Sequence, residues 1–458
     1  MKLLLISANM AASPYPVYPL GRSMVAAALR TAGHEVALFD FLQQGQSLEA
    51  LAAALRQEAP ALIGISIRNI DNVNLLNEQR YLDAVRDIIR TIRAATAAPV
   101  VLGGSGFSVM PEALLRELGA DYGVVGEGEA VFTDFVAQAA RGVFPAERLL
   151  RSRPQLAGRA IPSAAYDPAI LSFYLQSGHM ASVQTKRGCT HHCVYCTYPV
   201  LEGQAIRPRD PEAVVDDVQT LVGQHQAKYV FFTDSVFNDD DGHYLDVVRA
   251  MQRRGICTPW TAFFKPDPRL TDEIVELMKS TGLKAAELGS DAPSDATLRG
   301  LGKSFTFREV DATNSLFLNH GVATAHYFMF GGPGETPDTV REGIANIASL
   351  RKTAIFVFMG IRILPGTPLE AVALREGVIA PGQPLLDPIY YLSPQVDRQW
   401  LEATLTEAFA KLRHVVFPPD ALDRTLQFLF KLGYTGSLWD MLVEPRSAHR
   451  REKRHGAP

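Results

Sequence analysis

Short β-rich runs alternate with amphipathic helical stretches over the first 140 residues of this 458-residue chain. Five such runs separated by helices predict a parallel, doubly wound α/β sheet, in which ligands bind at the carboxyl ends of the strands. In one helix Leu82, Val85, Ile88, Ile89 and Ile92 share a face, as an amphipathic helix requires. The expected strands are residues 2–6, 35–40, 62–67, 100–103 and 122–125, and the expected helices are residues 23–32, 47–57, 79–94 and 111–118.

A second alternation begins near residue 181, and its six strand–helix units favour an open or partial barrel over a second flat sheet. Its expected strands are residues 181–185, 229–233, 258–264, 285–288, 324–330 and 355–363, and its helices are 211–223, 242–253, 271–280 and 336–350. Prolines and a lack of periodicity before this region indicate a linker. We expect a Rossmann-like domain over 1–140, a linker over 141–180, a partial (β/α)6 TIM barrel over 181–380, and a mostly helical region over 381–458 with a charged tail at 446–455.

The composition excludes several classes of protein. Hydrophobic residues make up 47% of the chain and charged residues 21%, which excludes a disordered scaffold. The net charge of −4 argues against a nucleic-acid partner, since such proteins usually carry a strongly basic domain. No apolar run approaches the roughly 18 residues of a membrane span, and the apolar start at residues 1–6 is too short for an export signal.

Three of the four cysteines fall within eight residues, as Cys189, Cys193 and Cys196 in a CxxxCxxC pattern directly after an expected strand. Three thiolates in such a loop can hold one face of a 4Fe–4S cluster and leave one iron open for another ligand. The alternative is a structural zinc site completed by His191 or His192, but zinc sites usually use two separated pairs of ligands. The clustering indicates a metal site in a reducing, cytoplasmic compartment rather than a disulfide framework.

The fourth cysteine, Cys257, stands alone at an expected strand start, where a buried structural thiol is the default interpretation.

With the aromatic Tyr195 before the last cysteine, this motif resembles the hallmark of the radical S-adenosylmethionine (AdoMet, SAM) superfamily. The resemblance implies that AdoMet chelates the open iron, and that the reduced cluster cleaves it to methionine and a 5′-deoxyadenosyl radical. It also implies an external electron donor of the flavodoxin or ferredoxin type.

Four downstream segments are similar to AdoMet-contacting segments of that superfamily: residues 231–237, 287–292, 331–336 and 363–369. Asp291 and Ala292 stand where many relatives have Glu and Ser, so Glu287 or Ser290 is expected to take over contacts to the ribose. The alternative for 331–336 is a turn that starts a helix. The residues that the resemblance assigns to AdoMet are Tyr195, Asp234, Glu287, Ser290, Asp291, Gly331, Gly332 and Pro333.

A doubly wound domain before such a barrel resembles the cobalamin-binding architecture, and the resemblance is carried by residues 19–21, 103–106 and 124–129. The Asp-x-His-x-x-Gly motif is absent, which implies base-off cobalamin without a histidine ligand. Arg68 stays protonated and so is no ligand; it is expected to block water or pair with a corrin amide, the alternative being a surface salt bridge or turn. The expected cobalamin contacts are Arg68, Asn69, Gly103, Gly104, Ser105, Gly126, Glu127 and Gly128.

Two rival interpretations of the first domain stay open. A nucleotide-binding Rossmann module is disfavoured, because residues 7–14 after the first strand contain no Gly-x-Gly-x-x-Gly. A remnant domain that kept the fold and lost its cofactor is the other.

Together these features predict a cobalamin-dependent radical AdoMet enzyme that methylates an unactivated carbon of a small-molecule or lipid-like substrate. The alternatives are a cyclase or rearrangement enzyme with the same cofactors, or a non-catalytic iron–sulfur module. No catalytic acid or base is identified. Aromatic residues near the end are expected to cap the barrel mouth or, more commonly for such residues, to pack in the core: Trp400, Phe417, Phe428, Phe430 and Trp439.

Overall fold

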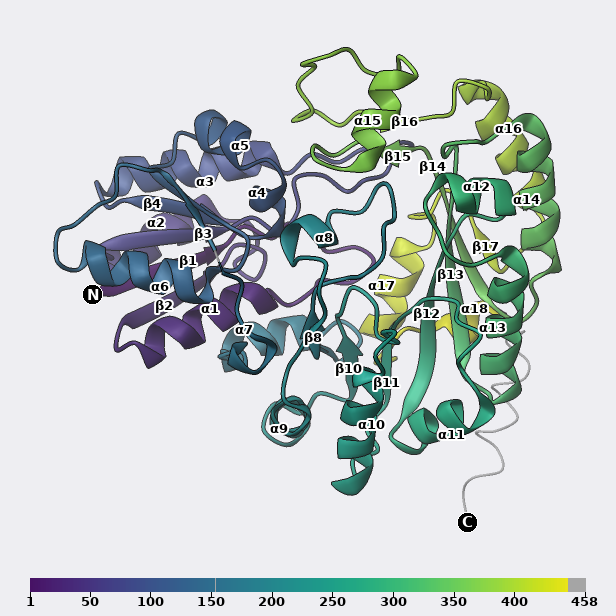
Figure 1. Ribbon diagram of the computed structural model, residues 1–458. Coiled ribbons are helices and arrows are strands. Elements are labelled where there is room, and N and C mark those ends of the chain that lie inside the picture. Colours follow the sequence, from purple (N-terminus) through teal and green to yellow (C-terminus); the bar gives the residue numbers. More distant parts are fainter. Residues whose placement is uncertain (153, 444–458) are drawn as a thin grey trace.

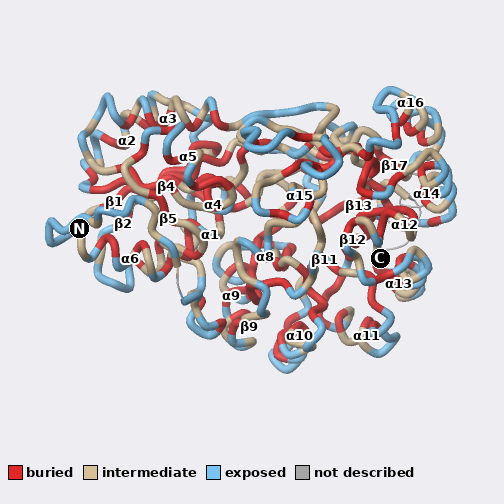
Figure 2. Tube along the Cα trace, turned by 45° about the horizontal axis from the view of Figure 1, so that its top comes forward, coloured by how far each residue is buried: buried red, intermediate tan, exposed pale blue. Residues whose placement is uncertain are grey.

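Two parallel β-sheets, each covered by helices, lie side by side in the computed structural model (Figure 1). The structure describes residues 1–152 and 154–443, so the charged tail expected at 446–455 lies outside the described residues. Figure 2 shows that buried segments concentrate in the strands of both sheets, whereas exposed segments fall mainly on the outer helices and loops.

The first sheet has the strand order β2-β1-β3-β4-β5-β6, and all its pairs are parallel. Its strands are nearly continuous apolar runs because helices cover both faces. The strands are β1 Lys2–Ser7, β2 Glu35–Asp40, β3 Leu62–Ser66, β4 Val100–Gly103, β5 Tyr122–Val125 and β6 Leu149–Arg151. The helices are α1 Leu20–Thr31, α2 Leu48–Glu58, α3 Leu82–Ala95, α4 Ser105–Val109, α5 Pro111–Leu118 and α6 Gly128–Ala139.

The five strands expected here are confirmed, and the apolar face of α3 is buried as its spacing requires. The expectation that 141–180 is irregular was wrong, since β6 lies in this segment and pairs with β5, from Gly123↔Leu149 to Val125↔Arg151. The segment also contains η1 Gly158–Ala160 and α7 Pro168–Leu175. A strand of three residues is too short to show a period, so its pairing partner decides its conformation.

The second sheet has the order β7-β10-β11-β12-β13-β14-β17, all parallel, as expected for an open (β/α) barrel. Its strands are β7 Met180–Val183, β10 Tyr229–Phe232, β11 Trp260–Phe264, β12 Leu283–Asp291, β13 Ala323–Phe330, β14 Ala354–Met359 and β17 Val415–Val416. Its helices are α9 Pro211–Gly223, α10 His243–Arg253, α11 Asp272–Ser280, α12 Asp295–Gly300, α13 Phe307–Asn319 and α14 Pro337–Ser349.

The last expected strand, 355–363, is broken at Gly360, where the backbone has φ +74°. Residues beyond it turn into a separate antiparallel ribbon, β15 Ile361–Arg362 with β16 Tyr390–Tyr391. Helix α15 Pro368–Arg375 precedes residue 380. The region after residue 380 contains the helices α16 Arg398–Phe409, α17 Asp423–Lys431 and α18 Trp439–Val443, and it also supplies the short strands β16 and β17.

Between the two sheets lies the segment that carries the cysteine motif (Figure 1). It begins with the short strand β8 Lys186–Arg187, which pairs with β9 Arg207–Pro208, and it includes the one-turn helix α8 Tyr198–Leu201. Helix α8 packs against α4 of the first domain.

A long loop of the first domain, residues 67–81, contacts the second domain. Its Asp71 forms an ion pair with Arg362, with an Oδ2–Nε distance of 3.0 Å, and both side chains are at most 3% exposed. Asn74 donates a hydrogen bond to Asp420, and Arg80 pairs with Asp387. This loop therefore fastens the first sheet to the far end of the second.

Replacing Arg362 with methionine should lower the free energy of unfolding by about 3–5 kcal/mol, because the Asp71 carboxylate would stay buried without its partner. Equilibrium urea denaturation measures this change. The control is Arg90→Met, which removes a partner of Asp87 at an exposed site and should change stability by about 0.5 kcal/mol or less. Equal, small effects of both substitutions would contradict the structural importance of the Asp71–Arg362 pair.

Candidate functional site

A cavity of about 580 Å³ lies where the carboxyl ends of both sheets meet. From the first sheet it is lined by Ser7, Ser66 and Gly103 at the ends of β1, β3 and β4; from the second, Gln184 and Thr233 follow β7 and β10. Ligand sites in parallel sheets form at these ends, and the volume is in the range of small-molecule sites. The cavity is the best candidate for a cofactor site.

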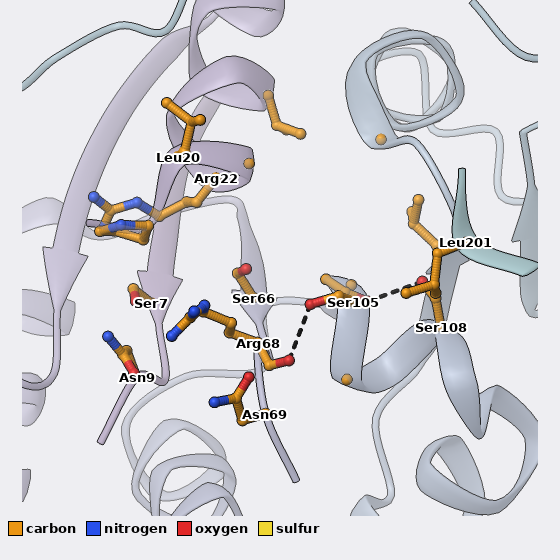
Figure 3. A pocket seen from close by; sticks show the side chains of 18 of the residues that line it. Ser7, Asn9, Leu20, Arg22, Ser66, Arg68, Asn69, Ser105, Ser108 and Leu201 are labelled. Carbon is orange, nitrogen blue, oxygen red and sulfur yellow. Dashed lines mark hydrogen bonds between the residues drawn. The ribbon is translucent and has the colours of Figure 1, made fainter. Parts of the chain in front are cut away.

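Hydrogen bonds tie the loops on the first domain's side of the cavity together (Figure 3). The Ser105 hydroxyl donates to the carbonyl of Arg68 at 2.9 Å, and the Ser108 hydroxyl donates to that of Gly104 at 2.8 Å. Gly104 has φ +97°, and a Cβ there would lie 2.5 Å from the Ile67 carbonyl oxygen. Only glycine fits this close approach of two loops.

The structure brings all eight residues expected to contact cobalamin to this one cavity. Arg68 makes no ion pair with any described residue, so the alternative of a surface salt bridge is not what the structure shows. In Figure 3 its side chain points across the pocket toward Ser7 and Asn9 at the end of β1. Glu127 differs from the others, because its carboxylate is held by Arg187 and Arg207 of the second domain.

The inner end of the cavity is apolar. It reaches the core between the sheet and helices α1 and α6, where Leu5, Val101, Val124 and Phe132 line it. A Cβ on Gly64 would lie 2.7 Å from the Leu5 side chain, so glycine keeps this end open. A polar rim and an apolar floor suit a large amphipathic ligand such as cobalamin, which has an amide-edged ring and an aromatic base.

Sequence reasoning missed the wall that the second domain supplies to the cavity. Tyr198 and Leu201 of α8, together with Thr197, directly follow the last cysteine of the motif and line the same space as the first domain's loops. Their position just after Cys196 was the one sequence feature that could have marked them as part of the site. Without the fold, nothing in the sequence showed that the first domain lies opposite them.

Backbone hydrogen bonds shape the cysteine loop. Cys189 N donates to the Gly203 carbonyl at 3.1 Å, and Val194 N donates to that of Leu301 at 3.0 Å. Burial raises the pKa of Cys193, and raises that of Cys196 to about 12. These two thiols are therefore protonated unless a cation is bound, since metal ligation requires thiolates and releases their protons.

The pattern of the three cysteines fits a cluster better than a single ion. Four ligands on one zinc ion place their sulfur atoms about 3.8 Å apart, given a Zn–S bond of about 2.3 Å. Within the described residues, the three cysteines do not form such a compact group with one another or with either histidine. The preference for a cluster therefore rests on the CxxxCxxC pattern and its three thiolates.

The expectation for Cys257 was wrong, because this residue is exposed. It lies in the loop before β11, which begins only at Trp260.

Tyr195 and Asp291, both assigned to AdoMet by the resemblance, contact each other near the cysteine loop, and their contact with AdoMet stays a prediction. The Tyr195 hydroxyl donates to Asp291 at 2.7 Å, and Lys303 forms an ion pair with the same carboxylate while lying over the Tyr195 ring. Lys303 was missed, since no motif marks it. This polar group beside the cluster loop suits the amino-acid and ribose groups of AdoMet.

Asp234, also expected to contact AdoMet, is fully engaged within the chain. Its carboxylate accepts hydrogen bonds from the Thr185 backbone at 2.7 Å, the Thr185 hydroxyl at 2.5 Å and the Lys186 ammonium at 3.2 Å. All three groups are buried. Asp234 thus anchors the chain that leads into the cysteine loop, and its proposed contact with AdoMet stays a prediction.

Glu287 and Ser290 are hydrogen-bonded to other residues of the second domain. The Glu287 carboxylate accepts hydrogen bonds from Trp439 at 2.7 Å and Tyr327 at 2.8 Å inside the barrel, and burial raises its pKa to about 7. The Ser290 hydroxyl is hydrogen-bonded to His326 at 2.7 Å. The structure leaves neither residue an obvious free group for the ribose.

The segment 331–336 forms a turn that starts a helix, as the alternative interpretation had it. The amides of Gly331 and Gly332 donate to the Glu335 carboxylate, whose pKa burial raises to about 7, and Thr336 is the N-cap of α14. Pro333 is buried in the same turn. Contacts of this turn with AdoMet stay a prediction.

The aromatic residues near the end mostly pack in the core. Trp439 and Phe430 are buried against the inner face of the barrel. Trp400 and Phe417 pack at the edge of the main core. Phe428 is 60% exposed, so it does not pack in the core.

Comparison with known families gives two matches along the chain. Residues 6–136 match the B12 binding domain, and residues 183–346 match the radical SAM superfamily. Among the described residues, no helix is long and apolar enough to cross a membrane.

Two curated relatives have different activities. The tryptophan 2-C-methyltransferase of Streptomyces laurentii is 28% identical, over 76% of this chain and 71% of that protein. The anaerobic magnesium-protoporphyrin IX monomethyl ester cyclase of Rubrivivax gelatinosus is 25% identical, over 53% of this chain and 47% of that protein.

Among solved structures, the radical S-adenosylmethionine methyltransferase TsrM of Kitasatospora setae, with cobalamin and a [4Fe-4S] cluster bound, has a TM-score of 0.84. It is 25% identical, and the match covers 100% of this chain and 99% of that one. A second TsrM structure contains tryptophan as substrate and a SAM analog.

Replacing Cys189, Cys193 and Cys196 together by alanine should abolish the brown absorbance and remove about four irons per chain, because three thiolates hold the cluster. Iron and sulfide analysis of anaerobically purified protein measures this. The control is Cys257→Ala, which should keep the full iron content. Iron retained in the triple variant, or zinc alone in the native protein, would refute the cluster assignment.

Proposed function

Because the chain belongs to the cobalamin-dependent radical SAM enzymes, in which a B12-binding domain precedes a radical SAM domain, we propose that it methylates an unactivated carbon of a small molecule. One observation carries the proposal. The cavity of the B12-binding domain is closed by Thr197, Tyr198 and Leu201, which directly follow the last cysteine of the cluster motif. A methyl carrier held in this cavity and a radical source held by the cysteine loop would face a common space.

When bound, the cluster with AdoMet supplies a radical that abstracts hydrogen, and cobalamin carries the methyl group. The chain's own residues hold and separate these groups. The loops at 67–69 and 103–106 would hold the ring of cobalamin, and Cys189, Cys193 and Cys196 would hold the iron. Arg68 would exclude water or bind an amide without coordinating cobalt, because a guanidinium group is a poor metal ligand.

The concave face of the barrel supports an apolar, planar substrate. Phe263 on β11 is 37% exposed, and the half-buried Tyr327 on β13 lies beside it. Tyr327 and Phe358 also pack against the buried cluster of Phe430 and Trp439. The ring of Phe263 lies 6.0 Å from that of Tyr327, centroid to centroid. Aromatic walls bind planar apolar groups well. Tryptophan, the substrate of the similar TsrM, has such a body.

We also propose that the protein works in the cytoplasm with an external electron donor of the flavodoxin or ferredoxin type, and that it does not act on nucleic acid. The cluster has to be reduced before it reacts, and free thiols persist in a reducing compartment. The net charge of −4 supports the absence of a nucleic-acid partner.

The second candidate is a cyclase or rearrangement with the same cofactors. The match to the cyclase of Rubrivivax gelatinosus favours it, but that match covers about half of each chain. The tryptophan 2-C-methyltransferase and TsrM match over most of both chains, so methyl transfer is the stronger proposal.

The full-length protein should bind hydroxocobalamin with a base-off spectrum, because the sequence lacks the Asp-x-His-x-x-Gly histidine that would coordinate cobalt. An absorbance titration measures both the affinity and the coordination state. A base-on spectrum would contradict the assigned cobalt environment. Absence of binding by the full chain would remove cobalamin from the proposal and favour a remnant domain.

Turnover should yield S-adenosylhomocysteine, 5′-deoxyadenosine and methylated product in equal amounts, because one AdoMet gives the methyl group and a second gives the radical. Anaerobic assays with mass spectrometry measure the three products. With deuterium at the target carbon, the label should appear in 5′-deoxyadenosine. Product with S-adenosylhomocysteine alone would contradict hydrogen abstraction, and product with 5′-deoxyadenosine alone would refute methyl transfer in favour of a cyclase or rearrangement.

A further inference from the structure

Four charged side chains form a buried cluster between the two domains. Glu127 and Glu129 come from the start of α6 in the first domain, and Arg187 and Arg207 come from the β8–β9 pair that frames the cysteine loop. Arg187 lies 2.5 Å from Glu129 and 3.4 Å from Glu127, and Arg207 also pairs with Glu127. No side chain of the four is more than 12% exposed. Water therefore screens these charges poorly.

The cluster is connected to the cysteine loop by a short chain of contacts. Arg187 stands two residues before Cys189, and its Nε donates to Gln184 at 2.9 Å. Gln184 donates to Glu202 at 3.2 Å, and the other oxygen of Glu202 accepts the amide of Gly188 at 3.1 Å. Gly188 has φ +93°, and a Cβ there would lie 2.0 Å from the Ala205 carbonyl oxygen. The backbone next to the first cysteine ligand therefore has little freedom.

The same side chains line the cavity that we assign to cobalamin: Glu127, Glu129, Gln184, Arg187 and Glu202. The pKa of Glu127 is held below its ordinary value, since the hydrogen bond from Arg207 and the charge of Arg187 outweigh the effect of burial. One oxygen of Glu129 has no hydrogen-bond partner among the described residues. In a buried network, an acceptor without a hydrogen-bond partner is costly, so a ligand in the adjacent cavity that donates to it would change the energy of the whole network.

We propose that Glu129 and Arg187 are positioning residues that couple occupancy of the cobalamin cavity to the geometry of the cysteine loop; this inference rests on the proposed function. Bound cobalamin would complete the wall against which Arg187 is held. Arg187 in turn fixes the backbone that presents Cys189. By linkage, cluster and cobalamin then strengthen each other's binding by the same factor.

The test measures the cobalamin dissociation constant of the full chain before and after the iron is removed anaerobically with a chelator. For the unmodified protein, the cluster-loaded form should bind hydroxocobalamin about fivefold or more tightly than the cluster-free form. The readout is an absorbance titration, so it does not depend on activity.

Variants separate positioning from stability. Arg187→Met leaves the Glu129 carboxylate buried without a partner, whereas Glu127 keeps Arg207, and should lower the thermal unfolding temperature. Adding Glu129→Gln removes that unpaired charge, and neutral replacements of a buried pair are often tolerated. We expect this double variant to recover stability while its ratio of dissociation constants stays near one. Arg187→Lys, which keeps the charge and loses the planar fork, should fold and show a ratio below that of the unmodified protein.

The matched control is Arg86→Met with Glu117→Gln, an exposed ion pair of the first domain, and it should keep the full ratio. A double Arg187/Glu129 variant that keeps the original ratio would overturn the inference, as would a ratio near one in the unmodified protein. If the double variant does not fold, an unchanged ratio in Arg187→Lys overturns it instead. Failure of the unmodified protein to bind cobalamin at all would count against the proposed function, which distinguishes the two failures.

Discussion

The carboxyl ends of two parallel sheets open onto one cavity, and the rest of the functional architecture depends on this arrangement. Each parallel sheet needs helices on its faces, so its loops gather polar groups and free backbone at one edge. Placing two such edges opposite each other brings the loops after β3, β4 and β5 within the same cavity as the residues that follow Cys196. Neither domain alone could build this site.

Besides the apolar cluster that joins the two domains, ionic contacts hold the two edges in register at the points closest to the site. Asp71 pairs with Arg362, and Glu129 pairs with Arg187; each pair joins a loop of the first domain to the second. Buried ion pairs contribute little net stability, because desolvation of both charges offsets their attraction. What they provide is a defined geometry, since an arginine fork accepts few arrangements of its carboxylate. Two cofactors that must react across a shared space require such a geometry.

Several residues that motif resemblance assigns to cofactors are engaged with the protein itself. Asp234 is bound by Thr185 and Lys186, and Glu127 is bound by two arginines. These side chains orient the segments that carry the cysteines and the cavity wall. Such supporting contacts are commonly as important to a metal site as the ligands, because they fix the direction in which the ligands point.

The sequence by itself determined the two alternating domains and the cysteine motif. Buried parallel strands are apolar runs that need no knowledge of their neighbours, and the spacing of Cys189, Cys193 and Cys196 is a local property of one loop. Only the tertiary structure decided β6 and β17, since strands of two or three residues take their conformation from a pairing partner distant in sequence. It also decided that Lys303 meets Asp291 and that Arg187 meets Glu129, 58 residues away along the chain. Charged side chains find partners through space, and a single sequence carries no periodic signal for a contact between separate domains.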